Sequence, residues 1–132
     1  MINNAALMND TLSTELMDLN IETSKGITIV QVIGELDAVT APVFQEQVLP
    51  LADQQPKILL DMSRVTYLSS AGLRILLLLY RKLSENVGQI VIAGLNDDVR
   101  DVMAITGFLD FFHIVETRND GIKALRQPKT HA

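Results

Sequence analysis

Apolar and polar residues alternate near the start of the chain, and further along the apolar residues gather into short runs. Leu19, Ile21 and Thr23 alternate with polar neighbours, and residues 27–33 are rich in β-branched side chains. The Ser-Lys-Gly sequence of residues 24–26 favours a turn between them. The pattern therefore predicts an antiparallel hairpin. We expect residues 34–37 (Gly-Glu-Leu-Asp) to follow the hairpin as a loop.

The middle of the chain predicts strands that alternate with helices. Residues 57–62 (KILLDM) and 89–95 (QIVIAGL) each contain consecutive apolar residues, as in strands covered on both faces. A helix is expected to begin at Thr40 as its N-cap, with Pro42 in its first turn, and to stop near Pro50. Two further helices are expected, one from Ser70 to about Asn86 and one from Asn96 or Asp97 to Ala104, the latter ended by Gly107.

The last quarter of the chain predicts an apolar connector over residues 108–112, a short strand over 113–117 and a helix over 121–126. The element order is then ββαβαβαβα, which predicts an α/β fold with a mixed, largely parallel sheet. With 132 residues the chain fits one domain, expected over residues 18–127. We expect residues 1–17 to be a flexible extension or a loose helix, and residues 128–132 a polar tail.

The predicted helix after Ser70 has two distinguishable faces. At helical spacing, five apolar residues fall on one face and are assigned to the core. They are Leu73, Leu76, Leu77, Tyr80 and Leu83. Leu78 points the other way, among Arg74, Arg81 and Lys82. Because that face begins beside Ser70, Arg74, Leu78 and Arg81 are candidates for a partner surface.

Composition excludes several classes of function. Lys and Arg number 11 against 16 Asp and Glu, a formal net charge of −5, which argues against non-specific nucleic-acid binding. The chain has no cysteine, which excludes disulfides, thiolate zinc sites and a thiol nucleophile. The longest apolar run, residues 75–80, is far shorter than a membrane span, and the first twenty residues lack Lys and Arg. We expect a soluble protein of the cytoplasm, without a signal peptide.

The candidate chemistry lies in residues 61–74, DMSRVTYLSSAGLR, which connect a predicted strand to a predicted helix. Ser70 is expected at or near the helix N-cap, where free N–H groups and the helix dipole favour negative charge. A phosphate on Ser70 would add roughly −1.5 to −2 charges there at small cost to the fold. Ala71 and Gly72 are expected to leave room for a partner's backbone. In isolation, a serine at such a position is most often only a cap.

The pattern Asp-x-Ser-x-Val-x-Tyr-x-Ser-Ser-Ala-Gly-Leu of residues 61–73 resembles the phosphorylation loop of STAS domains, specifically of anti-sigma factor antagonists. Residues 34–37 resemble a second loop of that family, and the resemblance covers roughly residues 19–126. It implies that Ser70 is the phosphoacceptor. Ser69 stands where well-studied members often have Asp and is the less favoured second acceptor. It implies that Asp37 flanks the partner surface, whereas on local grounds Asp37 is equally a turn or capping residue.

The resemblance also implies the partners. The unphosphorylated domain would bind an anti-sigma factor, a serine kinase with a histidine-kinase-like ATPase fold, and thereby release a sigma factor. Phosphorylation of the loop serine would end the complex, and a PP2C-type phosphatase would restore binding. The domain itself would need no catalytic residue and no cofactor. The expected partner surface therefore comprises Asp37, Ser69, Ala71, Gly72, Arg74, Leu78 and Arg81.

Other classes find less support. Ser70 in Ser-Ala-Gly resembles half of a hydrolase nucleophile elbow, but Leu68 replaces the first glycine, and only His113 and His131 are available as a base. No phosphate-binding glycine loop follows a predicted strand, and no His or Cys cluster offers a metal site. The alternative inside the same fold is a STAS interaction module, a scaffold that is never phosphorylated.

Overall fold

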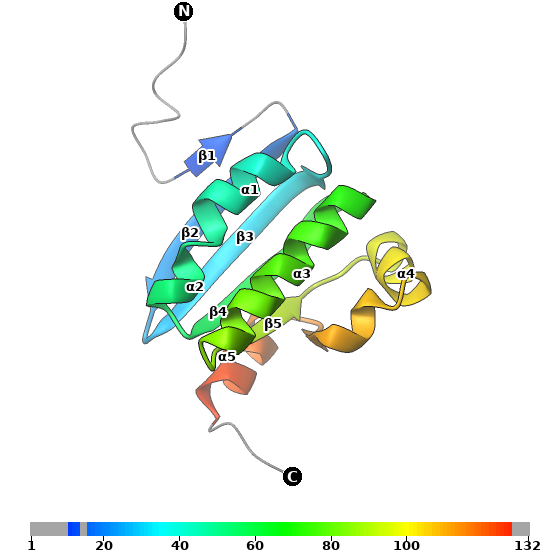
Figure 1. Ribbon diagram of the computed structural model, residues 1–132. Coiled ribbons are helices and arrows are strands. Elements are labelled where there is room, and N and C mark those ends of the chain that lie inside the picture. The colour runs from blue at the N-terminus through cyan, green and yellow to red at the C-terminus, as the bar shows by residue number, and fades with distance from the viewer. Residues whose placement is uncertain (1–10, 14–15, 128–132) are drawn as a thin grey trace, which may run out of the picture.

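The chain folds as one mixed α/β sheet with helices on both faces, as the element pattern predicts (Figure 1). The computed structural model describes residues 11–13 and 16–127. Within them, six strands lie in chain order across the sheet, the first two pairs antiparallel and the other three parallel. The strands are β1 (Thr11–Ser13), β2 (Met17–Ser24), β3 (Ile27–Leu36), β4 (Lys57–Leu68), β5 (Gln89–Ala93) and β6 (His113–Val115). The predicted hairpin, β2 and β3, is confirmed.

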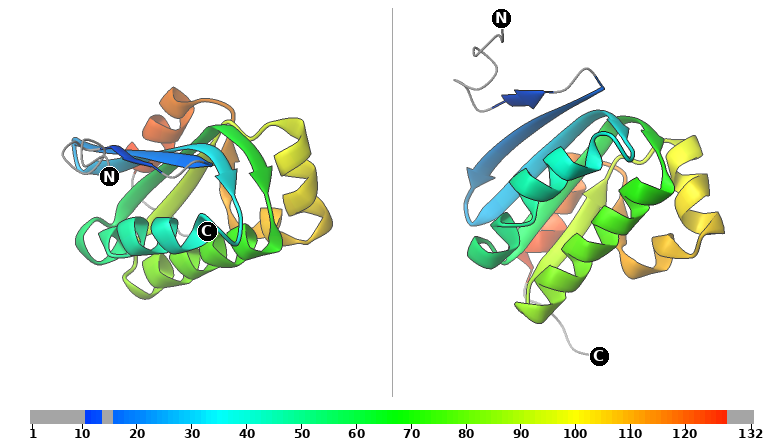
Figure 2. Two further views of the ribbon diagram at one scale, coloured as in Figure 1. Left: turned by 90° about the horizontal axis from the view of Figure 1, so that it is seen from above. Right: turned by 45° about the horizontal axis from the view of Figure 1, so that its top comes forward.

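The helices form two unequal layers. They are α1 (Ala41–Val48), α2 (Leu51–Gln54), α3 (Ser70–Glu85), α4 (Asp97–Ile105) and α5 (Arg118–Arg126), with a 3₁₀ turn, η2 (Phe108–Phe111). Figure 2 shows α1, α2 and α3 along one face of the sheet, α5 on the other and α4 beside the sheet. The predicted alternation of strands and helices is confirmed, and α2 is an addition to it.

β4 separates two apolar cores. Ile58 and Leu60 face the layer of α1 to α3, where Phe44 is fully buried. Leu59, between them in sequence, points to the other face and packs in a smaller cluster with Leu125 of α5. Successive side chains of a strand point to opposite faces, so a strand buried on both sides must be apolar at consecutive positions. This is the reason for the apolar run that predicted the strand.

β3 and β4 both continue past their predicted ends. Residues 34–36, expected as a loop, are the last residues of β3, and residues 63–68 extend β4. The pairing of β3 with β4 shifts register at two places, so that β4 accommodates extra residues while it stays paired. Such bulges bend a strand without ending it. The polar residues in both segments favoured a loop, and pairing with the neighbouring strand overrode that local preference.

The N-terminal prediction needs correction where the structure describes it. Residues 11–13 form β1 at the sheet edge, paired with β2, and Met17 is a buried residue of β2. The expected flexible or loosely helical extension over residues 1–17 is therefore wrong for these positions. Residues 1–10 and 14–15, together with the expected tail over 128–132 that contains His131, lie outside the described residues.

The buried face of α3 also differs from the predicted one. Ile75 and Leu79 are buried, whereas Leu77 and Tyr80, assigned to the core, are only partly buried. The other three predicted positions, Leu73, Leu76 and Leu83, are buried as expected. Every residue from 75 to 80 is apolar, so helical spacing alone could not decide which of them face the sheet.

Candidate functional site at the start of helix α3

The ends of β3 and β4 hold the start of α3 in place. Leu36 and Leu68 are paired across the two strands, and the Ser69 N–H donates to the Leu36 carbonyl at 3.0 Å. Gly72, in the first turn of α3, is packed so closely that a Cβ there would meet the same carbonyl oxygen and the Leu68 side chain. The two sequence segments of the resemblance, residues 34–37 and 61–73, are thus brought together.

Gly72 has a different role from the predicted one. We expected it to leave room for a partner's backbone, but Gly72 is buried and its missing side chain makes room for the end of β3. The expectation was wrong for this residue, because the close approach occurs inside the molecule. Ala71, one residue earlier, is partly exposed and remains available at the surface.

Ser69 and Ser70 differ in burial and in bonding. Ser69 is the N-cap of α3, and its Oγ accepts a hydrogen bond from the Gly72 N–H at 3.3 Å. Ser70 is the first residue of the helix and is exposed. Within the described part of the chain its hydroxyl has no hydrogen-bond partner. The cap expected at or near Ser70 is therefore Ser69, and Ser70 has a free hydroxyl.

Asp37 organises the turn that leads into α1. Its Oδ1 accepts hydrogen bonds from the backbone N–H groups of Val39 at 2.9 Å and Thr40 at 3.1 Å. Thr40 is the N-cap residue of α1, as predicted, but its side chain is fully buried and makes no capping bond; its hydroxyl donates to the Glu35 carbonyl at 2.8 Å. Asp37 thus makes the turn contacts that local reasoning proposed for it, and it is only partly buried.

A shallow groove of about 280 Å³ runs between α1 and α3, next to Ser70. Its lining residues are Ala38, Ala41, Pro42, Gln45, Ala71, Arg74, Ile75 and Leu78. Leu78 is 37% exposed, as predicted, and Arg74 is the one charged residue of the lining. Arg81 is exposed on the same side of α3. The structure therefore gathers Ala71, Arg74 and Leu78 along one groove, and Arg81 lies beyond it.

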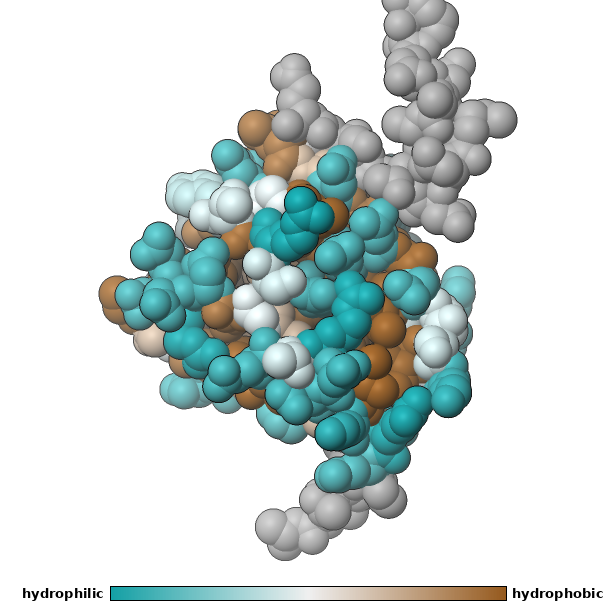
Figure 3. All heavy atoms as spheres, turned by 180° about the vertical axis from the view of Figure 1, so that it is seen from behind, coloured by the Kyte–Doolittle hydropathy of each residue, from teal (hydrophilic) through white to brown (hydrophobic). Residues whose placement is uncertain are grey.

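A second polar cluster lies on the opposite face of the sheet, the side that carries mostly hydrophilic residues in Figure 3. Asp61 is buried, and Arg118 Nε and Nη2 donate to its Oδ2 at 3.0 and 2.8 Å. The Ser63 N–H and Oγ donate to Oδ1 at 3.0 and 2.7 Å. Glu22 Oε2 lies 3.6 Å from Arg118 Nη1. Sequence reasoning missed this cluster, because Arg118 is far from Asp61 along the chain.

The cluster keeps Asp61 ionised. Burial alone would raise the pKa of this carboxyl. The hydrogen bonds from Ser63 and the guanidinium of Arg118 outweigh burial, so the pKa of Asp61 lies below its ordinary value. Every oxygen of the carboxylate is therefore occupied by donors of the chain itself, which is typical of a structural ion pair.

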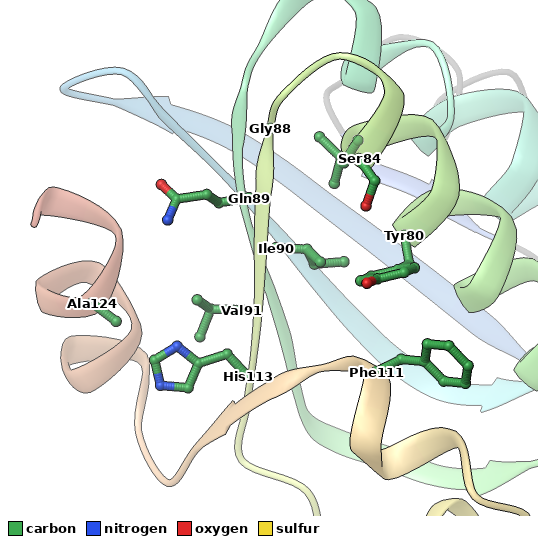
Figure 4. A pocket seen from close by; sticks show the side chains of 10 residues that line it. Tyr80, Ser84, Gly88, Gln89, Ile90, Val91, Phe111, His113 and Ala124 are labelled. Atoms are coloured by element: carbon green, nitrogen blue, oxygen red, sulfur yellow. The ribbon is translucent and has the colours of Figure 1, made fainter. Parts of the chain in front are cut away.

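His113 does not meet Ser70. It lies on β6 in a separate hollow near the C-terminal half of α3, lined also by Tyr80, Ala124 and Phe111 (Figure 4). In that view the His113 ring lies on the Ala124 side of β5, while Tyr80 and Phe111 lie together on the other side. Tyr80 comes ten positions after Ser70 on α3, about 15 Å along the helix axis. The serine and histidine that a hydrolase would need are thus apart.

Two further kinds of feature are absent from the part of the chain that the structure describes. It contains no group of three or more His, Cys, Asp or Glu side chains arranged to hold a metal ion. None of its helices combines the length and the apolar character that crossing a membrane requires.

Comparison with known proteins places the chain in a family. The family model of the STAS domain matches residues 18–121. The anti-sigma-B factor antagonist of Staphylococcus aureus is 33% identical over 103 residues, covering 76% of this chain and 95% of that protein. BtrV of Bordetella bronchiseptica is 30% identical over 111 residues, covering 83% and 96%.

A solved structure agrees with the sequence relatives. An anti-sigma factor antagonist from Mycobacterium paratuberculosis is 31% identical and superposes with a TM-score of 0.78 over 88% of this chain and 100% of that one. The family model spans well over half of the chain, and apart from β1, α2 and the 3₁₀ turn η2 the strand and helix order is the one that the resemblance implied. The chain therefore belongs to the STAS domain family, in its group of anti-sigma factor antagonists.

Proposed function

We propose that the chain is a phosphorylation-controlled anti-sigma factor antagonist. In its unphosphorylated form it binds an anti-sigma factor that is also a serine kinase with a histidine-kinase-like ATPase fold. The kinase transfers the γ-phosphoryl group of ATP to the Ser70 hydroxyl, ADP leaves, and the complex dissociates. A PP2C-type phosphatase hydrolyses the phosphate and restores binding. In this scheme the chain supplies the switch and the partner supplies the catalytic residues.

The observation that carries the proposal is the contrast between the two serines of the loop. Ser70 is exposed and its hydroxyl is unbonded within the described chain, whereas Ser69 is partly buried and caps α3. A kinase must reach the hydroxyl and take its proton, and a free hydroxyl on the first turn meets both needs. Negative charge at that position is favoured by the helix dipole. Phosphate on Ser70 would leave the cap intact.

The partner surface that we propose extends from Ser70 along the groove between α1 and α3. Ala71, Arg74 and Leu78 line that groove, and Asp37 organises the turn that leads into α1. Arg81 continues the exposed side of α3, and Ser69 joins the loop to the end of β3. A partner that covers this surface would lie over Ser70, so a phosphate there would fall inside the interface.

The proposal is tested by mixing the purified chain with each histidine-kinase-like serine kinase of its own genome, adding ATP, and mapping phosphate by mass spectrometry. The expected result is phosphate on Ser70 and loss of the complex in size-exclusion chromatography. Ser70→Ala should bind the same kinase, stay unlabelled and remain bound in ATP. Ser69→Ala is the matched control and should still be labelled at Ser70.

Other outcomes have a definite meaning. Label on Ser69 in place of Ser70 would move the switch by one residue and contradict the argument from the free hydroxyl. Binding without label on any serine would favour the alternative function, a STAS scaffold that is never phosphorylated. In that case Ser70 would be an ordinary residue of the first helical turn.

A further inference from the structure

Ser70 begins a row of exposed side chains along α3 that includes two unpaired cations. At 3.6 residues per turn, Ser70, Arg74 and Arg81 lie within about 40° of one another around the helix. All three are exposed. In the part of the chain that the structure describes, neither Arg74 nor Arg81 makes an ion pair. Lys82, the next cation along the helix, is paired with Asp53 at 3.4 Å.

Arg74 is placed to meet a group attached to Ser70. Residues four apart on a helix face each other across one turn. A serine phosphate carries three strong acceptor oxygens, and the arginine fork pairs with such oxygens through two parallel N–H donors. Arg81 is eleven residues from Ser70, about 16 Å along the axis, and lies too far away for a direct contact.

We propose that Arg74 changes partners when Ser70 is phosphorylated. In the unphosphorylated chain Arg74 is the free cation on the rim of the groove between α1 and α3, available to a carboxylate of the docked protein. In the phosphorylated chain Arg74 pairs with the phosphate one turn earlier, and the groove loses its cation. This inference rests on the proposed function, and it names Arg74 as the residue through which the phosphate changes the groove.

A phosphate on Ser70 would repel a carboxylate of the docked protein directly. The change of partner by Arg74 adds a second effect, because it removes the cation that the carboxylate would pair with. The remaining lining of the groove is uncharged: small apolar residues, Pro42, Gln45, Ile75 and Leu78. With Arg74 engaged elsewhere, a carboxylate of the docked protein would lie beside a dianionic phosphate and have no cation opposite it. The kind of partner that fits is therefore a protein segment with an apolar side chain for the groove and a carboxylate next to it.

The test needs no kinase. The full chain is made with phosphoserine incorporated at position 70 during translation, and the second pKa of the phosphate is measured by ³¹P NMR. An arginine that pairs with the dianion lowers this pKa below the value of about 6 for a free phosphoserine. We expect Arg74→Gln to raise it by about 0.5 unit at low salt, and the difference to shrink at high salt.

Arg81→Gln is the matched control, with the same charge change on the same side of α3, and it should leave the pKa unchanged. Equal pKa values in the phosphorylated parent and in Arg74→Gln would overturn the inference, as would equal shifts in the two variants. Because the phosphate is installed without an enzyme, failure of every kinase to label Ser70 would overturn the proposed function and leave this measurement intact.

Discussion

Residues 61–74 form one continuous stretch of the chain that contributes Asp61 and Ser63 to the buried polar cluster and Ser70 and Arg74 to the exposed start of α3, yet the two places differ in how far their polar side chains are paired. Asp61 is buried and accepts hydrogen bonds from Ser63 and Arg118 on both of its oxygens. Ser70 and Arg74 are exposed and have no partner in the described chain. The paired cluster holds elements of the fold together, and the unpaired surface is the one that we propose a partner covers.

The largest expected effect comes from breaking the paired cluster. Asp61→Asn should lower the free energy of unfolding by about 2–4 kcal/mol, because the partly buried guanidinium of Arg118 would lose its carboxylate. Urea denaturation measures it. Arg74→Gln on the unpaired surface is the control and should change stability by less than about 0.5 kcal/mol. Equal losses in both variants would remove the distinction between the two regions.

Substitutions on the unpaired surface should change partner binding and leave stability nearly unchanged. Leu78→Asp places a charge on the rim of the apolar groove and should weaken binding of the kinase that the proposed phosphorylation experiment would find by about ten- to a hundredfold, with a nearly unchanged Tm. Calorimetric titration measures the affinity. Val87, 75% exposed beyond the end of α3, provides the control, since Val87→Asp should bind normally. Equal affinity of the Leu78 variant would exclude the groove from the interface.

The ion pair also predicts a pH dependence. Because the pKa of Asp61 is lower in the folded than in the unfolded chain, its contribution is fully present above the unfolded value, near 3.9. As pH falls below that value the unfolded chain takes up the proton first, and stability declines by at most about 1.4 kcal/mol per pH unit from this group. Urea denaturation between pH 5 and pH 3 should show a shallower decline in Asp61→Asn than in the parent chain. Parallel curves would mean that other carboxyls account for the acid sensitivity.

The smallest expected effect is a difference in stability between alanine variants of the two loop serines. Ser69→Ala removes a cap and should cost about 1 kcal/mol of unfolding free energy, whereas Ser70→Ala should change it by less than about 0.5 kcal/mol. Thermal denaturation of the two variants side by side measures the difference. The reverse order would show that Ser70, contrary to the structure, caps the helix.

The order of the elements was predictable because each segment carries its own signal. The hairpin, the buried strand β4 and the helix after Ser70 follow from alternation, apolar runs and turn residues. The candidate site could be proposed from the sequence only through the resemblance, since a serine on a helical first turn is ordinary in itself. The choice between Ser69 and Ser70 as the cap depends on where β4 ends. That end is fixed by the pairing of Leu68 with Leu36, and the sequence around either residue does not indicate this pairing.

The remaining differences have similar causes. Residues 34–36 look like a loop and become strand because β4 pairs with them. The buried face of α3 passes through Ile75 and Leu79, which spacing could not single out within a fully apolar run. The contact of Asp61 with Arg118 joins β4 to α5, which are far apart in sequence, so no local sequence pattern predicts it.

The contact between Gly72 and the end of β3 has a consequence for the speed of the switch. The first turn of α3 is held by the Leu36 carbonyl and by the Ser69 cap, so we expect a phosphate on Ser70 to change the surface without moving the backbone. The proposed switch would then need no slow conformational step of the chain itself. Under the proposed function, the response time would be set by how fast the kinase and the phosphatase act and by how fast the partners separate.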